Sequence, residues 1–160
     1  SKFGNKFKIK HISGNNNRIL VERIYNSHNI ASEVLEFSHE MDLLYDWSDI
    51  VISRAGSMTL SEICKAGRAA ILVPFLYATD RHQHHNAKFL QDSMAAIIVE
   101  ENDSFSRMLN KYLSKLYSDQ EILLKLSKNG KNLFPEDSSA IILNNIPELN
   151  ETYNNTASKK

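Results

Sequence analysis

The stretch from Asp49 to Asn86 constrains the fold more than any other part of the chain. It opens with Ile50 to Ser53, a β-branched apolar run of the length expected for a buried parallel strand. A turn at Gly56 leads into a helical segment that closes at Gly67, and Ala70 to Val73 is typical of a second buried strand. This succession of strand, turn, helix and strand predicts an α/β fold with a parallel sheet.

The rest of the chain continues the alternation. Apolar periodicity predicts further strands at 7–12, 34–37 and 95–99, and helices at about 17–25, 38–47, 82–90, 103–116, 119–133 and 140–145. We therefore expect a Rossmann-like parallel sheet of about five strands flanked by helices. Residues 1–147 are expected to form one domain, and the polar tail 148–160 is expected to be disordered.

Three local patterns give more detailed expectations. Thr59 and Glu62 have the spacing of a capping box, which predicts that the central helix begins close to Thr59. Phe37 ends a short apolar strand and is expected in the core. One helix shows four apolar residues spaced to turn a single face inward, namely Ile19, Leu20, Ile24 and Tyr25.

Composition excludes some classes of function. The 19 basic and 19 acidic residues cancel, so nothing suggests nucleic acid as a partner. A mean hydropathy of -0.38, no apolar stretch of transmembrane length and a polar N-terminus favour a soluble chain without a signal peptide. The only cysteine, Cys64, fits a reducing compartment, and no motif presents it to a base.

The helix after Gly56 is a candidate phosphate site. Its free amides and the positive end of its dipole converge at the end of the preceding strand, and glycine lets a ligand approach the backbone. A plain strand-to-helix connection is the alternative, because a glycine with a capping box occurs in many α/β proteins. Arg54 suits a phosphate and a structural salt bridge equally well.

A second polar cluster, His82 to Asn86, follows the next strand. Ligands of open α/β sheets bind at the carboxyl ends of strands, so both clusters are expected on one rim. Three histidines and the nearby Asp80 raise the question of a metal. Only His82 and His85 have helical ligand spacing and no H-E-x-x-H pattern is present, so we expect no metal site.

Three motifs together resemble a known family. R-A-G-S-M-T-L-S-E-I at 54–63, V-P-F at 73–75 and D-R-H-Q-x-x-N-A at 80–87 are similar to the C-terminal half of the MurG-like glycosyltransferases, which add N-acetylglucosamine to lipid I. The resemblance extends from about Phe7 to Ile146. It implies one half of a two-domain GT-B fold, UDP-N-acetylglucosamine as donor, and no cofactor. Family members commonly carry serine or glycine where this chain has Ala55.

The resemblance also implies roles for individual residues. Residues 57–59 would face the diphosphate, Glu62 would accept hydrogen bonds from the ribose, and Ser38 would lie at the uracil. Gln83 and Asn86 would bind the hydroxyls of the donor sugar, with His82 assisting. The implied contact residues are Ser38, Arg54, Gly56, Ser57, Met58, Thr59, Leu60, Ser61, Glu62, His82, Gln83 and Asn86.

Other parts of the family pattern have no counterpart in this chain. The N-terminal half, which in the family binds lipid I, supplies the candidate base and contacts the membrane, is absent, so no catalytic residue is expected here. The strand that opens the family's C-terminal half is absent too, and it would lie between the strands at 7–12 and 50–53. Another polypeptide could fill that slot, the two strands could close up, or the domain could be marginally stable.

We interpret the chain as a fragment that is inactive alone, from an inverting transferase of peptidoglycan synthesis on the inner face of the cell membrane. Two alternatives stay open. The chain could be a stand-alone binding or assembly subunit of a split transferase, or another sugar-nucleotide enzyme such as an epimerase.

Overall fold

Strands and helices alternate along the chain, as expected. The computed structural model describes residues 6–75 and 81–134, so the predicted helix at 140–145, the tail 148–160, the first five residues and Asp80 lie outside the described part. The elements, in order, are β1 (Ile9–Ile12), α1 (Arg18–Ser27), β2 (Ser32–Leu35), α2 (Met41–Trp47), β3 (Ile50–Ser53), α3 (Ser57–Lys65), β4 (Ala69–Leu72), α4 (His82–Asp92), β5 (Ala96–Ile98), α5 (Phe105–Ser118) and α6 (Gln120–Leu133).

The five strands form two parallel sheets rather than one. β1 pairs with β2, and β3, β4 and β5 form a second sheet in that order. The chain divides in the same way into two compact units, unit 1 up to Trp47 and unit 2 from Ser48. The α/β class and the five parallel strands are therefore confirmed. The strands at 7–12 and 50–53 belong to different units, so the possibility that they close up stays a prediction.

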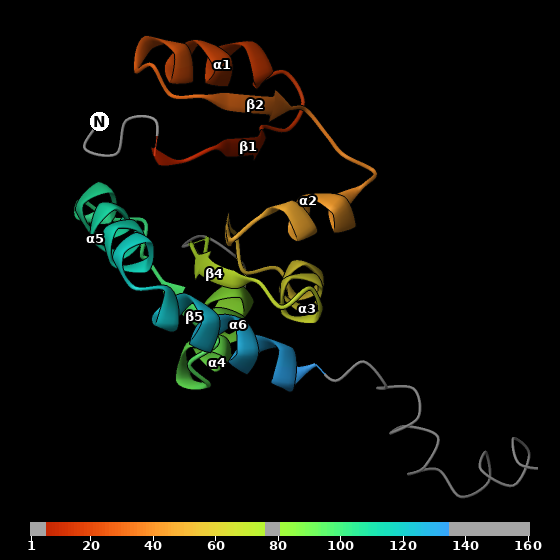
Figure 1. The fold of residues 1–160 in the computed structure, drawn as a ribbon. Coiled ribbons are helices and arrows are strands. Elements are labelled where there is room, and N and C mark those ends of the chain that lie inside the picture. The colour runs from red at the N-terminus through yellow and green to blue at the C-terminus, as the bar shows by residue number, and fades with distance from the viewer. Residues whose placement is uncertain (1–5, 76–80, 135–160) are drawn as a thin grey trace, which may run out of the picture. The chain divides into compact units, whose positions relative to one another are not determined.

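Unit 1 consists of α1 packed beside the β1–β2 pair, followed by α2 (Figure 1). Lys10 and Glu33 are partners in this ladder, and their Nζ and Oε2 atoms are 3.0 Å apart. The expectation of an inward apolar face on α1 is wrong for three of its four residues. Ile19, Leu20 and Ile24 are each more than half exposed. Two short strands offer too narrow a surface to bury a whole helix face.

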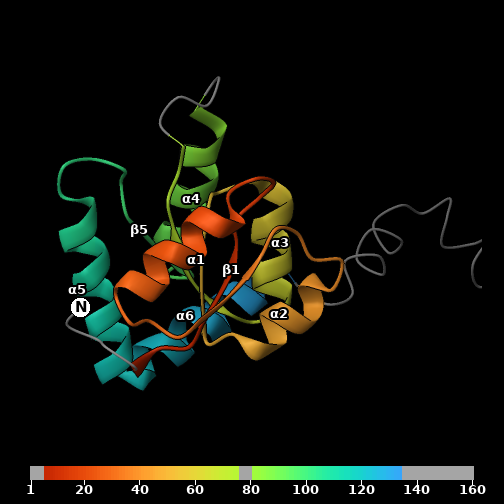
Figure 2. The same cartoon turned by 90° about the horizontal axis from the view of Figure 1, so that it is seen from above.

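Unit 2 holds the larger core. β4 is its central strand and all four of its residues are buried. Successive strand residues point to opposite faces, so Ala69 and Ile71 share one face and pack with Val99, Leu116 and Leu126. Residues of α5 and α6 thus cover this side of the sheet. Figure 2 shows α5 and α3 on opposite sides of unit 2.

The three strands of unit 2 end at the same level. Ser53 pairs with Leu72, and Leu72 pairs with Ile98, and these are the last residues of their strands. The segments that follow, residues 54–56, 73–75 and 99–101, therefore emerge side by side, and we call them the strand-end rim. Ligands of parallel α/β sheets bind at such a rim.

A glycine at positive φ closes α3. Gly67 has φ +61°, and the amide of Arg68 donates to the carbonyl of Ile63, as in a Schellman cap. We expect Gly67→Ala to destabilise the protein by about 1 kcal/mol, because an L-residue pays this cost in the left-handed region. Urea unfolding measures the effect. Gly67→Asn should recover most of the loss, since asparagine tolerates this conformation, and equal losses for both variants would contradict the explanation.

Candidate functional site

The first element of the site is the start of α3. The helix begins at Ser57, with Gly56 as its N-cap residue in an extended conformation and without a side-chain cap. The predicted capping box is therefore wrong, because Thr59 already lies in the first turn and the amide of Leu60 donates to the Gly56 carbonyl. Since Gly56 has no side chain to accept the first amides, the N-terminus of α3 presents its amides at the rim without a side-chain acceptor.

The residues of this first turn divide by exposure. Ser57 and Met58 are exposed, whereas the side chain of Leu60 is buried in the core. Leu60 also uses its amide within the helix, which leaves it a packing role in this structure. Ser61 donates its hydroxyl to the Ser57 carbonyl at 3.1 Å. Residues 57–59 thus carry the groups that a ligand could reach.

Two side-chain amides of α4 connect two segments of the rim. The Oε1 atom of Gln83 accepts from the amide of Phe75 at 3.1 Å, and the Nδ2 atom of Asn86 donates to the carbonyl of Ala55 at 3.2 Å. Because a backbone amide needs an acceptor and a carbonyl needs a donor, these partners fix the orientation of both side chains. The structure thus brings the two polar clusters together on one rim.

The hydrogen bonds of Gln83 and Asn86 each use one polar atom of the side chain, and the other polar atom is the one that could bind a ligand. Each bond engages one end of a side-chain amide, which has a donor end and an acceptor end. The other ends are the amino group of Gln83 and the carbonyl oxygen of Asn86. One donates and the other accepts, and a hydroxyl group can partner either of them.

Arg54 lies directly between β3 and α3 and is held by an ion pair. Its Nη1 atom is 2.6 Å from Oε2 of Glu101 and 3.3 Å from the carbonyl of Val73. Its guanidinium also lies 5.4 Å from the centre of the Phe75 ring. Of the two interpretations of Arg54, the structure therefore shows the salt bridge, and a contact with phosphate stays a prediction.

This ion pair contributes little to stability. The hydrogen bond from Arg54 lowers the pKa of Glu101 below its ordinary value. A lowered carboxyl pKa stabilises the folded state above the unfolded pKa, and this contribution is lost as the pH falls through the folded pKa. Both side chains are about half exposed, 46% and 48%, so solvent screens the interaction strongly.

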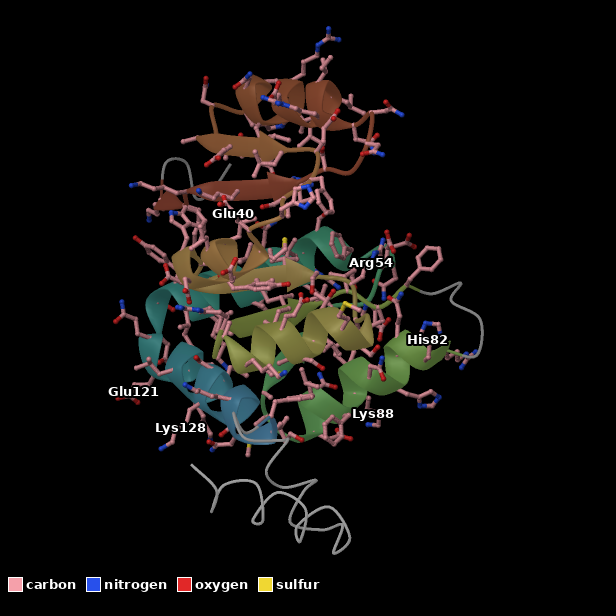
Figure 3. The ribbon with its side chains drawn as sticks, turned by 90° about the vertical axis from the view of Figure 1, so that its right-hand side faces the viewer. Glu40, Arg54, His82, Lys88, Glu121 and Lys128 are labelled. Carbon is pink, nitrogen blue, oxygen red and sulfur yellow. The ribbon has the colours of Figure 1, made fainter. Side chains whose placement is uncertain are left out.

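His82, at the start of α4, lies at the same end of unit 2 as Arg54. Figure 3 shows His82 and Arg54 at this end, with Glu121 and Lys128 at the other. His84 pairs with Glu100 through Nε2 and Oε1 at 3.3 Å. Across residues 6–75 and 81–134, no three His, Cys, Asp or Glu side chains gather in a way that could hold a metal ion. Likewise, no helix in this part is long and apolar enough to cross a membrane.

Ser38 belongs to unit 1, so it is described apart from the rim of unit 2. It lies between β2 and α2, and its hydroxyl accepts from the amide of Glu40 at 3.1 Å. The expectation that Phe37 is in the core is wrong, because its side chain is 66% exposed. The ring instead packs edge-on against His39, with the ring centres 4.8 Å apart.

Cys64 is buried between α3 and α6, and Gly130 lies directly opposite it. Burial raises the pKa of Cys64 to about 11, so only about one molecule in a thousand carries the reactive thiolate at pH 8. We therefore expect almost no reaction with Ellman's reagent at pH 8 until guanidinium unfolds the protein. Glutathione serves as the reagent control. Rapid labelling of the folded protein would contradict this placement of the thiol.

Comparison with known proteins identifies the family. Residues 1–140 match the glycosyltransferase family 28 C-terminal domain, and the chain belongs to this family. The expected resemblance is thereby confirmed for most of the chain.

Relatives of similar sequence carry the name UDP-N-acetylglucosamine--N-acetylmuramyl-(pentapeptide) pyrophosphoryl-undecaprenol N-acetylglucosamine transferase. The protein from Coxiella burnetii (strain RSA 493 / Nine Mile phase I) is 33% identical over 78% of this chain, which spans 35% of the relative. The protein from Aeromonas hydrophila subsp. hydrophila is 34% identical over 91% of this chain and 40% of the relative. The chain thus spans little more than a third of these relatives.

A solved structure agrees with these sequence matches. The crystal structure of Acinetobacter baumannii MurG superposes with a TM-score of 0.78 at 28% identity, covering 89% of this chain and 41% of that protein. The α/β architecture is therefore that of the corresponding part of a MurG.

Sequence reasoning missed one residue of the rim. Glu101 pairs with Arg54, although 47 residues separate them. A signal for it was present, because Glu100 and Glu101 follow directly on the strand 95–99. The rule that places ligand groups at strand ends could have included them.

Proposed function

We propose that this chain carries the donor site of a glycosyltransferase that moves N-acetylglucosamine from UDP-N-acetylglucosamine to lipid I in peptidoglycan synthesis. The observation that carries the proposal is the contact of Asn86 with Ala55, which brings the sugar-binding candidates of α4 to the start of α3. The names of the sequence relatives support the choice of donor and acceptor.

Residues 1–147 together form the donor domain in this proposal. The amides of residues 57–59 and the positive end of the α3 dipole hold the diphosphate and stabilise it as the leaving group. Glu62, one turn further along, accepts hydrogen bonds from the ribose hydroxyls. The amino group of Gln83 and the carbonyl oxygen of Asn86 bind hydroxyls of the hexose, His82 assists them, and Ser38 contacts the uracil.

The chemical step needs groups beyond this site. In the proposed reaction the acceptor hydroxyl displaces UDP directly at the anomeric carbon, with inversion. The part of the relatives that this chain does not span would provide the lipid I site, the base and the peripheral contact with the inner face of the membrane. The role of the present residues is to position the donor sugar and its leaving group.

Calorimetric titration tests the proposal. We expect saturable binding of UDP-N-acetylglucosamine and of UDP, and much weaker binding of uridine, because most of the site faces the diphosphate and the sugar. UDP-glucose serves as the specificity control. Absence of any nucleotide binding would overturn the proposal and favour a binding or assembly role.

Gly56→Ala is expected to weaken ligand binding while leaving the stability of the fold nearly unchanged. The backbone of Gly56 has φ −70°, and among the described residues a Cβ there would meet only the Thr59 hydroxyl oxygen, at 4.0 Å. We expect a change in unfolding free energy below about 1 kcal/mol, because two effects oppose each other. Alanine restricts the unfolded chain more than glycine does, which stabilises the protein. Alanine is also a poorer N-cap residue, which destabilises the helix. UDP affinity should fall about 5- to 150-fold, from the 1–3 kcal/mol typical of an added methyl in a filled contact. Unchanged affinity would show that no ligand approaches the backbone here.

A further inference from the structure

We propose that Glu101 sets the affinity of this site for phosphate by competing for Arg54. The inference rests on the proposed function, because it concerns how the same rim meets the diphosphate of a nucleotide. Glu101 is a positioning residue in this view: it acts on the ligand through Arg54 and does not touch the ligand itself.

Arg54 is placed to serve a phosphate. It is separated from the first residue of α3 only by Ala55 and Gly56, so it lies in the chain directly before the amides of residues 57–59. A guanidinium offers five donors in a planar fork that suits phosphate oxygens. The backbone contact with Val73 and the neighbouring Phe75 ring fix where this group lies.

The guanidinium already has an anionic partner within the chain. Glu101 approaches Nη1 to 2.6 Å from the segment after β5. This carboxylate therefore acts as an internal stand-in for a ligand phosphate, because both would use the same donor group. Both side chains of the pair are about half exposed, so replacing Glu101 by a phosphate as the partner of Arg54 costs little folding stability.

The neighbouring carboxylate provides a matched control. Glu100 lies one residue earlier in the same segment and pairs with His84 instead of Arg54. Glu100→Gln and Glu101→Gln each remove one negative charge from this rim segment. Only Glu101→Gln releases Arg54, so a difference between the two variants reports the competition and not the general change in charge.

The test measures UDP and uridine affinity by calorimetry for the unmodified protein, Glu100→Gln, Glu101→Gln, Arg54→Gln and the Arg54→Gln/Glu101→Gln double variant. We expect Glu101→Gln to bind UDP about two- to fivefold more tightly, the range set by an exposed ion pair. Glu100→Gln should show a smaller gain, and the gain of Glu101→Gln should vanish in the Arg54→Gln background. Uridine affinity should stay constant, and added salt should shrink the UDP effect.

The outcomes separate this inference from the function on which it rests. If the unmodified protein binds UDP but Glu101→Gln binds it no more tightly than Glu100→Gln, the competition is refuted and the donor site stands. Weaker UDP binding by Glu101→Gln would also refute it, since Glu101 would then be holding Arg54 in its working position. If no variant binds UDP, the proposed function fails and this inference fails with it.

Discussion

Glu62→Gln is expected to weaken the binding of UDP about 10- to 100-fold, because hydrogen bonds to a charged group contribute about 1.5–3 kcal/mol. The substitution keeps the size of the side chain and removes its charge, so the loss measures the carboxylate. Glu62 lies in α3, one turn beyond the exposed residues 57 and 58. Calorimetric titration of the purified variant with UDP gives the ratio directly.

The control for Glu62→Gln is a glutamate far from the rim. Glu121 lies at the other end of unit 2, in the first turn of α6 (Figure 3). Glu121→Gln makes the same chemical change and should leave UDP affinity within about twofold, since a screened charge at that distance has little effect. Equal losses in both variants would point to a general effect of charge and against a ribose contact.

The second large effect concerns the core of unit 2. Ile71 is fully buried in the central strand β4 and packs among Val99, Leu116 and Leu126. We expect Ile71→Ala to lower the unfolding free energy by about 2–5 kcal/mol, from lost apolar burial and the cavity left behind, whereas Ile71→Val should lose only about 0.5–1.5 kcal/mol. Urea unfolding followed by circular dichroism distinguishes the two.

An isoleucine on a neighbouring strand is the matched control. Ile52 of β3 is 47% exposed, so its truncation removes less buried surface. We expect Ile52→Ala to lose about 1 kcal/mol or less. If Ile52→Ala were as damaging as Ile71→Ala, the burial of β4 at the centre of this core would not be the reason for its sensitivity.

Much of the fold could be predicted because it follows from local patterns. The strand Ile50–Ser53 occurs where its apolar run predicts it, and the turn at Gly67 ends α3 as expected. Burial could not be predicted as well, because it depends on the surface that a partner element provides. Ile24 and Phe37 have core-like sequence patterns and yet are exposed, since the described residues of unit 1 provide a sheet of two short strands to pack against.

In the candidate site too, some features follow from local sequence patterns and others depend on distant parts of the chain. The strand-end rule correctly predicted that the residues after β3 and those of α4 lie on one rim, and the contact between Asn86 and Ala55 shows it. The prediction places the start of α3 at Thr59, two residues later than the structure does. The capping-box spacing of Thr59 and Glu62 does not take into account that the preceding Gly56 can serve as the N-cap residue. The partner of Arg54 depends on the path of a distant loop, which local patterns do not determine.

The hydrogen bonds of Gln83 and Asn86 to Phe75 and Ala55 have a consequence for engineering this scaffold toward other sugars. The two side chains that would select the sugar also fasten two loops to a helix, so replacing them alters loop order and selectivity together. A library that aims to change selectivity alone should keep both amides and vary exposed neighbours such as His82 and His85.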